Sequence, residues 1–155
     1  MSPAAPRVRR LEPADRSDWR RMRHALWPEE SGEELERGMA EWEARADAAV
    51  FVAVRPDGSV CGFVEAGSRS YADGCETSPV GYVEGWYVDP DVRRQGYGRA
   101  LLAAAEEWAR AAGYREMGSD ALIDNELSRQ AHVASGYEEV GRVIQFRKSL
   151  ARGDS

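Results

Sequence analysis

Apolar positions along the chain recur at two spacings, which predict an alternation of strands and helices. Strand-like runs occupy residues 8–11, 48–54, 60–66, 80–88, 116–120 and 137–148. Helical spacing recurs in four segments, which begin at Asp15 or Ser17, at Ser31, at Arg99 and at Asn125. These elements predict one domain over residues 1–155, with residues 1–6 and 151–155 as loose tails.

A short polar loop separates the strand that ends at Val88 from the helix that follows. Gly96 and Gly98 leave room for a ligand to approach the backbone, and the first N–H groups of a helix have no internal partner. Arginines add positive charge, so the loop predicts a phosphate or pyrophosphate site. No Gly-Lys-Ser/Thr follows and a third glycine is absent, which excludes a Walker loop and a dinucleotide fingerprint. The candidate donor-binding residues here are Tyr87, Val88, Arg93, Arg94, Gln95, Gly96, Tyr97, Gly98 and Arg99.

The composition of the chain limits the classes of protein to which it can belong. The chain has 155 residues, 43% of them hydrophobic, and a net charge of −6. This predicts a folded domain, argues against nucleic acid as a partner and suits a cationic substrate, although mild acidity also serves solubility alone. With two cysteines, Cys61 and Cys75, and no apolar run of about 20 residues, we expect a cytoplasmic protein without disulfides or a membrane partner. No spacing of His, Cys and Asp predicts a metal site.

The loop sequence Arg-Arg-x-Gly-x-Gly, after a strand that ends in Val-x-Pro, resembles the acetyl-coenzyme A signature of the GNAT superfamily of N-acetyltransferases. A narrower resemblance comes from Tyr71, from Gly-x-Glu-Thr-Ser-Pro-Val-Gly-Tyr-x-Glu-Gly at 74–85, from Glu-Glu-Trp-Ala at 106–109 and from Ser-Asp-x-x-x-Asp-Asn at 119–125. These segments look like the aminoglycoside 6′-N-acetyltransferases of bacterial resistance. The resemblance covers nearly the whole chain, from about Asp18 to Lys148.

The resemblance implies an α/β (α+β) fold: a mixed, mostly antiparallel, twisted sheet of about six to seven strands, flanked by four helices and splayed between the fourth and fifth strands. It also implies transfer of the acetyl group of acetyl-coenzyme A to the 6′-amine of an aminoglycoside. Direct attack by the amine in a ternary complex needs no protein nucleophile, but it needs a destination for the proton and a donor to the developing oxyanion. The superfamily's expected oxyanion donor is the backbone N–H of Val88, which depends on a bulge near Gly85 and Trp86.

Five residues are expected on the acceptor side. The resemblance assigns Asp120 to the substrate amine, as an anchor for the ammonium or as a base, and the alternative is a helix cap. Glu84 lies mid-strand, where a carboxylate needs a partner: a substrate amine, a water through which it acts as a base, or a cross-strand arginine. Trp27 and Tyr71 suit stacking against aminosugar rings, although simple packing is the alternative for Trp27. Glu76 adds a carboxylate in the loop that leads to Glu84.

Further donor contacts are expected from the last helix, whose cap position suits Asp124. The resemblance assigns Asn125 to the pantetheine arm of coenzyme A, and Ser128 lies one turn on and faces the same way. His132 takes the position of the superfamily's tyrosine that protonates the departing thiolate, which an imidazolium can do near neutral pH. A packed helix histidine is the alternative. The resemblance also implies a homodimer joined through the last strands, where residues 137–148 offer an apolar edge.

Two other functions compete with this interpretation. The first is acetylation of another amine, such as a polyamine, an amino acid or a protein N-terminus, by an enzyme with the same phosphate loop. The second is a coenzyme A-binding sensor without turnover, which needs the loop but neither Asp120 nor His132. The run from Tyr71 to Glu84 favours the aminoglycoside enzyme over the first alternative. The joint presence of Asp120 and His132 favours an enzyme over the second.

Overall fold

The computed structural model describes residues 5–152, which are built around one sheet. The strands lie side by side in chain order, and each is antiparallel to the next except for the last pair, which is parallel. They are β1 (Arg7–Arg10), β2 (Ala48–Val54), β3 (Val60–Arg69), β4 (Val80–Val88) and β5 (Met117–Ser119). The mixed, mostly antiparallel sheet predicted from the sequence is confirmed, but in the described residues it has five strands instead of six to seven.

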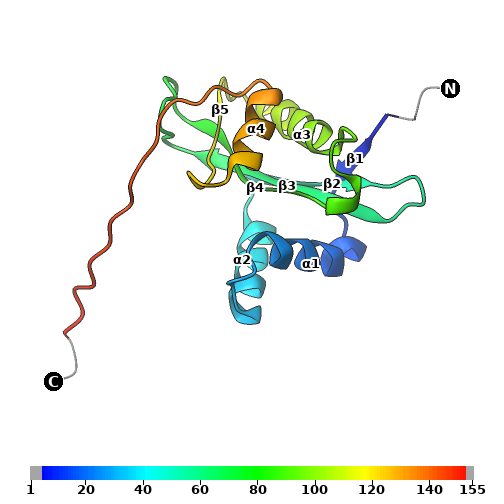
Figure 1. Cartoon of the computed structure of the whole chain (residues 1–155), viewed down its shortest axis with the longest axis horizontal. Coiled ribbons are helices and arrows are strands. Elements are labelled where there is room, and N and C mark those ends of the chain that lie inside the picture. The colour runs from blue at the N-terminus through cyan, green and yellow to red at the C-terminus, as the bar shows by residue number, and fades with distance from the viewer. Residues whose placement is uncertain (1–4, 153–155) are drawn as a thin grey trace.

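Helices cover both faces of this sheet (Figure 1). On one face lie α1 (Arg16–Leu26) and α2 (Gly32–Ala44), and on the other lie α3 (Tyr97–Ala111) and α4 (Glu126–Ala134). The four predicted helices are therefore confirmed, with ends that differ by a few residues. Single turns of 3₁₀ helix precede α1 and α3.

Apolar helix faces form a core on each side of the sheet. Burying a large apolar side chain contributes about 1.5–3 kcal/mol, so these contacts fix the helices and the loops between them. The core under α1 and α2 includes Trp19, Met22, Met39, Val52 and Phe63, which are all 0% exposed. The core under α3 includes Cys61, Val64, Leu101, Leu102 and Ala105.

The two N-terminal helices begin differently. At α2 the sequence prediction is confirmed, because Ser31 is the N-cap and its side chain accepts a hydrogen bond from the Glu34 N–H at 3.1 Å. At α1 the N-cap is Asp15, but its side chain does not cap the helix. Its carboxylate instead accepts hydrogen bonds from Arg9 at 2.7 Å and from the Glu12 N–H at 2.8 Å. Asp15 thus ties the start of α1 to β1.

A bulge in β4 bends the sheet where its ladder with β5 ends. Glu65 of β3 pairs with Gly85 but the next residue pairs with Val83, so Glu84 is an extra residue on β4. The bulge predicted near Gly85 and Trp86 is therefore present and lies at Glu84. In the described residues β5 pairs with β4 only at Gly81–Val83, so the splay predicted between the fourth and fifth strands is also present.

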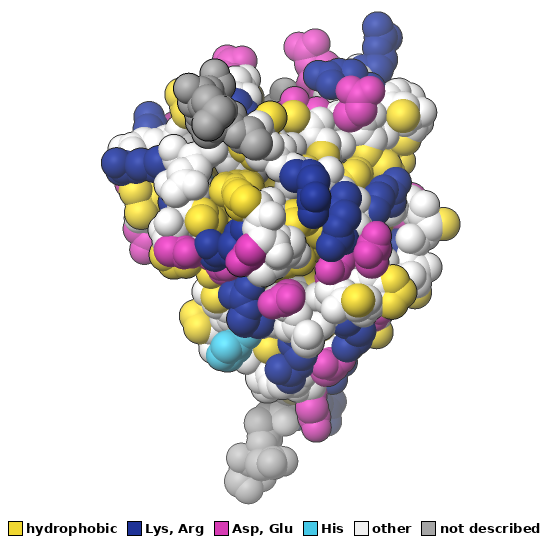
Figure 2. Space-filling view, turned by 90° about the vertical axis from the view of Figure 1, so that its right-hand side faces the viewer, with side chains coloured by type: hydrophobic (Ala, Val, Ile, Leu, Met, Phe, Trp, Pro, Cys, Tyr) yellow, Lys and Arg dark blue, Asp and Glu magenta, His cyan; other side chains and the backbone are white. Residues whose placement is uncertain are grey.

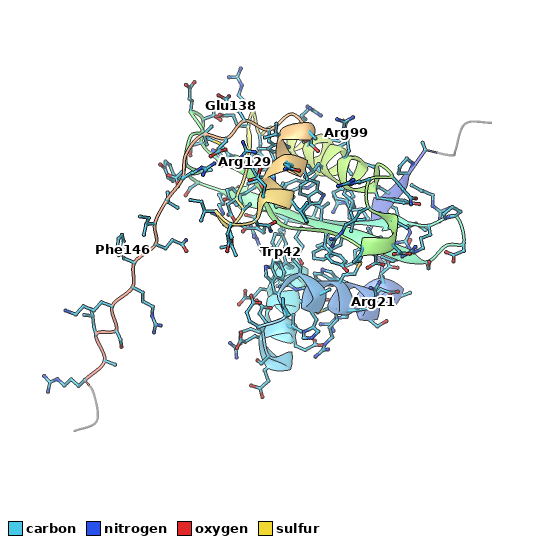
Figure 3. The ribbon with its side chains drawn as sticks, viewed as in Figure 1. Arg21, Trp42, Arg99, Arg129, Glu138 and Phe146 are labelled. Atoms are coloured by element: carbon cyan, nitrogen blue, oxygen red, sulfur yellow. The ribbon has the colours of Figure 1, made fainter. Side chains whose placement is uncertain are left out.

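The strand predicted for residues 137–148 does not form. This segment, with the residues up to Arg152, is an extended C-terminal arm that leaves the sheet and helices (Figure 1). Phe146, which Figure 3 labels on the arm, is 90% exposed and Ile144 is 80% exposed. Alternating apolar residues report a preference for a pleated, half-buried surface, but a strand also needs a neighbouring strand. The predicted tails at 1–6 and 151–155 fall mostly outside the described residues.

Candidate active site

The phosphate loop begins α3 with a backbone that only glycine adopts easily. Gly96 is the N-cap of α3 and has φ +91°, and Arg94, two residues before it, has φ +65°. The first hydrogen bond of the helix runs from the Ala100 N–H to the Gly96 carbonyl at 3.0 Å. The N–H groups of Tyr97, Gly98 and Arg99 therefore belong to the first turn, whose donors have no acceptor within the helix. This geometry suits a pyrophosphate.

The side chains around this loop divide into two groups. Arg94, Gln95 and Arg99 are exposed. Arg93 is exposed too, and its Nε donates to the Val88 carbonyl at 2.9 Å. Tyr97 is 8% exposed and packs in the α3 core, so only its N–H is available to a ligand. On the face shown in Figure 2, basic side chains lie next to acidic ones.

Trp86 and Arg99 connect the phosphate loop to α4. Trp86 Nε1 donates to the Gly98 carbonyl at 3.0 Å, and its ring meets the His132 ring edge-on with centroids 5.0 Å apart. Arg99 Nη2 donates to the Ala134 carbonyl at 2.5 Å, near the end of α4 (Figure 3). The loop and the predicted donor contacts of α4 are therefore held in one arrangement.

The end of β4 leaves one backbone donor pointing away from β3. The Asp89 N–H donates to the Cys61 carbonyl at 2.8 Å, and Gly62 lies opposite Val88 in the ladder. Successive amides of an extended strand point to opposite edges. The Val88 N–H therefore points away from β3, toward the side on which β5 pairs with the earlier part of β4. This is the direction that an oxyanion donor needs.

Two of the predicted acceptor carboxylates are joined by a chain of contacts. Arg69 of β3 binds Glu84 with two hydrogen bonds of 2.7 and 2.8 Å. The same guanidinium lies 3.6 Å from the ring centroid of Tyr82, and the Tyr82 hydroxyl donates to Asp120 at 2.5 Å. Burial and the neighbouring Asp120 raise the pKa of Tyr82, so it stays a donor. The arginine alternative for Glu84 is thus realised in this structure, and Asp120 does not cap α4.

His132 has two hydrogen-bond partners that define its tautomer. Its Nδ1 lies 2.7 Å from the Ser128 carbonyl, which can only accept, so Nδ1 carries a proton. Its Nε2 lies 2.8 Å from Ser119 Oγ at the end of β5. The neutral ring accepts from the Ser119 hydroxyl, and the protonated ring donates to it. His132 also meets the Tyr137 ring edge-on, so it is both packed and hydrogen-bonded.

The start of α4 places Asn125 and Ser128 together. Asn125, and not Asp124, is the N-cap, and its Oδ1 accepts from the Ser128 N–H at 3.1 Å. The amide nitrogen of Asn125 has no role in this cap and can donate to a ligand. Asn125 is exposed and Ser128 is half-buried, so both are accessible.

The remaining acceptor candidates lie in two places. Trp27 ends α1 and its ring abuts the β4 bulge, where a Cβ added to Gly85 would lie 2.9 Å from Trp27 Cη2. Tyr71 is 68% exposed, and its hydroxyl donates to Asp73 at 2.9 Å. Glu76 is exposed, and its N–H donates to Glu116 at 2.8 Å. In residues 5–152 the structure records no contact that joins Tyr71 or Glu76 to the other acceptor candidates.

A hollow of about 610 Å³ lies between the loop before β4, the β5 end and α4. Asp73, Asp120 and His132 line it, together with the first residues of the C-terminal arm. Six carboxylates and three arginines line the hollow, so its net charge is negative, which suits a cationic ligand. In the described residues no group of His, Cys, Asp and Glu could hold a metal ion. None of the helices in the same residues is long and apolar enough to cross a membrane.

Sequence reasoning missed several residues of this arrangement. Arg69 and Tyr82 join the two carboxylates, Trp86 joins the phosphate loop to α4, and Ser119 is the Nε2 partner of His132. Ser119 and Tyr82 stand inside the quoted motifs, which was a signal for them. Arg69 had none, because only the cross-strand geometry brings it to Glu84.

Comparison with known proteins agrees with this geometry. The profile of the Acetyltransferase (GNAT) family matches residues 18–137. An aminoglycoside N(6′)-acetyltransferase type 1 of Stenotrophomonas maltophilia is 44% identical over 97% of each chain. One of Klebsiella aerogenes, with the same name, is 44% identical over 95% of this chain and 99% of its own.

Solved structures are similar over the same extent. AAC(6′)-Iy in complex with the bisubstrate analogue CoA-S-monomethyl-acetylneamine superposes with a TM-score of 0.87 at 35% identity, covering 94% of this chain and 99% of its own. The 6′-N-acetyltransferase AAC(6′)-Ih from Acinetobacter baumannii gives 0.86 at 31% identity, over 95% of this chain and 100% of its own. Since the family profile covers most of the sequence and these relatives match nearly all of it, the chain belongs to the acetyltransferase (GNAT) family, in the group of aminoglycoside 6′-N-acetyltransferases.

Proposed function

We propose that this protein transfers the acetyl group of acetyl-coenzyme A to the 6′-amine of aminoglycoside antibiotics, and so confers resistance to them. The observation that carries the proposal is the pair of carboxylates, Glu84 and Asp120, joined through Arg69 and Tyr82 beside the end of the β4–β5 ladder. The names of the relatives support it. A polycationic sugar needs several carboxylates near the acyl donor.

Acetyl-coenzyme A supplies an activated acyl group as a thioester. Its pyrophosphate is bound by the N–H groups of the first turn of α3, which follow Gly96. Arg93, Arg94 and Arg99 add charge around it. Asn125 Nδ2 and Ser128 bind the pantetheine amides from the start of α4. These contacts hold the thioester in the gap between β4 and β5.

The amine attacks the thioester carbonyl directly. The new N–C bond forms as the C–S bond breaks, and the Val88 N–H donates to the carbonyl oxygen as negative charge develops there. Asp120 anchors the ammonium of the acceptor. The ammonium proton leaves through water to Glu84 before attack, and the second proton, which the nitrogen loses as the amide forms, leaves to solvent water. His132 returns a proton to the departing thiolate from its Nε2 side, where Ser119 lies within hydrogen-bond distance.

Steady-state kinetics with acetyl-coenzyme A test the function. We expect rapid acetylation of kanamycin-type aminoglycosides and none, or far slower acetylation, of spermidine and free amino acids. Asp120→Asn keeps the shape and the hydrogen bond from Tyr82 but removes the charge. It should lose on the order of 10²–10⁴-fold in turnover while acetyl-coenzyme A affinity stays the same. Rapid acetylation of spermidine without turnover of aminoglycosides would move the enzyme to another substrate class.

The C-terminal arm supports a homodimer as the working form. It exposes Val143, Ile144, Phe146 and Leu150 along an extended backbone, an arrangement that a soluble chain normally covers. Its backbone groups are also free to add to an exposed strand edge. We expect light scattering at micromolar concentration to give the mass of two chains, and Ile144→Asp with Phe146→Asp to give one. A monomeric wild-type protein would contradict the dimer.

The two cysteines form no disulfide in the structure, which suits a protein of a reducing compartment. Cys61 and Cys75 are both free thiols, and burial raises the pKa of Cys61 to about 11, which keeps it unreactive. We place the enzyme in the cytoplasm, where its thioester substrate is made. Fractionation of cells that express the full chain tests this placement.

A further inference from the structure

Trp27 is half-buried and packs against the core under α1 and α2, next to the β4 bulge that carries Glu84. It is the residue that ends α1, and its ring presses on the backbone of β4 at Gly85, next to the bulged Glu84. A Cβ on Gly85 would lie 2.9 Å from Trp27 Cη2, so only glycine leaves the ring in this place. One side of the ring is thus fixed by the sheet itself.

Arg23 fixes the ring from another direction. Its guanidinium carbon lies 4.8 Å from the centroid of the Trp27 ring and 5.7 Å from that of Trp19. Arg23 is only 4% exposed, although arginine is one of the residue types least often buried. A guanidinium held against an aromatic face in a water-poor site is strongly attracted to it. Arg23 therefore acts on Trp27 through both packing and charge.

The guanidinium of Arg23 is in turn held by two other elements. Glu65 of β3, which is 0% exposed, accepts hydrogen bonds from Arg23 Nη1 and from Trp19 Nε1, the latter at 2.9 Å. A Cβ on Gly38 of α2 would lie 2.5 Å from Arg23 Nη2, so α2 closes the space on that side. Burial raises the pKa of Glu65, and the adjacent Arg23 counteracts part of that rise.

Stability alone does not account for this buried pair. Replacing a buried ion pair by well-packed apolar residues is often neutral or stabilising, because the two charges lose their hydration. The core on this face of the sheet is otherwise apolar and includes Trp19, Met22 and Phe63. What the pair provides, and apolar residues would not, is a planar cation in a defined orientation against Trp27.

We propose that the buried Glu65–Arg23 pair is a positioning device for Trp27, which holds the indole ring where it stacks on the acceptor sugar and thereby sets acceptor affinity. This inference rests on the proposed function. Arg23 and Glu65 are positioning residues, since neither reaches the acceptor. They act on the binding of the sugar, while the acetyl donor and the proton transfers are served by β4, α3 and α4.

Arg23→Lys is the sharpest single test. Lysine keeps a positive charge for Glu65 but lacks the planar group that lies against the ring. At pH 8.5, where Glu65 is ionised, we expect the KM for kanamycin-type acceptors to rise about 3- to 10-fold. The kcat and the KM for acetyl-coenzyme A should stay within about twofold of wild type. Arg20→Lys, on the same helix but in an exposed pair with Glu36, is the matched control and should change none of these values.

A double-mutant cycle shows whether Arg23 acts through the ring. In a Trp27→Leu background the acceptor KM is already raised, and Arg23→Lys should raise it no further. If Arg23→Lys is too unstable to assay, the paired change Arg23→Met with Glu65→Leu removes both charges at similar volume and should raise the acceptor KM in the same way. A lower Tm with unchanged acceptor KM, or equal effects of Arg23→Lys in both backgrounds, would overturn the inference. Failure of the wild-type protein to acetylate any aminoglycoside would instead overturn the proposed function.

Discussion

Replacing Arg69 should change the acceptor KM, and the direction of the change distinguishes two roles. Arg69 either competes with the substrate ammonium for Glu84 or holds Glu84 in place for it. In the free enzyme Arg69 neutralises Glu84 through two hydrogen bonds and lies over Tyr82. An incoming ammonium must share Glu84 with this guanidinium. Arg69→Met keeps an apolar stem on the Tyr82 ring but removes the charge. We therefore expect the variant to bind polycationic acceptors more tightly than the wild type.

The magnitude follows from the exposure of the pair. The side chains of Arg69 and Glu84 are 42% and 28% exposed, so solvent screens much of their attraction. A pair of this kind is worth about 0.2–1 kcal/mol, which corresponds to an acceptor KM lowered by roughly 1.5- to 5-fold. Raising the salt concentration should shrink the difference.

Steady-state acceptor kinetics at low and high salt measure this effect. Arg16→Met is the charge-matched control, because Arg16 forms exposed pairs with Glu36 and Glu43 between α1 and α2. It should leave the acceptor KM unchanged. An acceptor KM that rises in Arg69→Met, with the fold intact, would refute the reasoning and show that Arg69 holds Glu84 in place for the substrate.

Three further changes have definite outcomes. Gly98→Val puts a Cβ 3.2 Å from the Trp86 ring and side-chain bulk over the first-turn amides, so calorimetry should show weaker acetyl-coenzyme A binding; unchanged affinity in a folded variant would remove the loop assignment. His132→Gln should lower kcat by about 10²-fold or more with little change in either KM, and an unchanged kcat would leave His132 a packing residue. Arg9 holds the pKa of the Asp15 carboxyl below its usual value. The ion pair therefore stabilises the fold at pH values above the usual pKa, and this stabilisation is lost as the pH falls through the lowered pKa. Asp15→Asn should cost about 1–3 kcal/mol at pH 7 in denaturant unfolding and progressively less in acid, whereas a deficit independent of pH would contradict an ionic origin.

The periodic parts of the fold were predictable because each signal is local. The spacing of apolar residues located all four helices, Ser31 marked the start of α2, and the glycines after Arg94 marked the start of α3. The prediction of a strand in the C-terminal arm was wrong because strand pairing is not a local property. Residues 137–148 have a strand pattern, but pairing depends on a neighbour that local sequence does not encode.

Site residues that lie within a sequence motif could be predicted. Contacts between residues that are distant in the sequence could not, because they form only when the chain folds. Asp120, His132 and the phosphate loop could be chosen from sequence. Arg69 and Glu84 lie 15 positions apart and meet only because β3 and β4 are adjacent. The Glu65–Arg23 pair spans 42 positions and needs α1 to lie over the sheet before it exists. A glutamate in an apolar strand was the only trace of it in the sequence.

The most direct test of the central claim compares two acceptors that differ at one atom. Kanamycin-type aminoglycosides with a 6′-amine and their analogues with a 6′-hydroxyl are incubated with the enzyme and acetyl-coenzyme A. Product mass and the position of the new acetyl group are then determined. We predict a single acetyl group on the 6′-nitrogen of the amine and no product from the hydroxyl analogue at the same enzyme concentration. Equal acetylation of both compounds, or an acetyl group on another nitrogen, would contradict the proposed reaction.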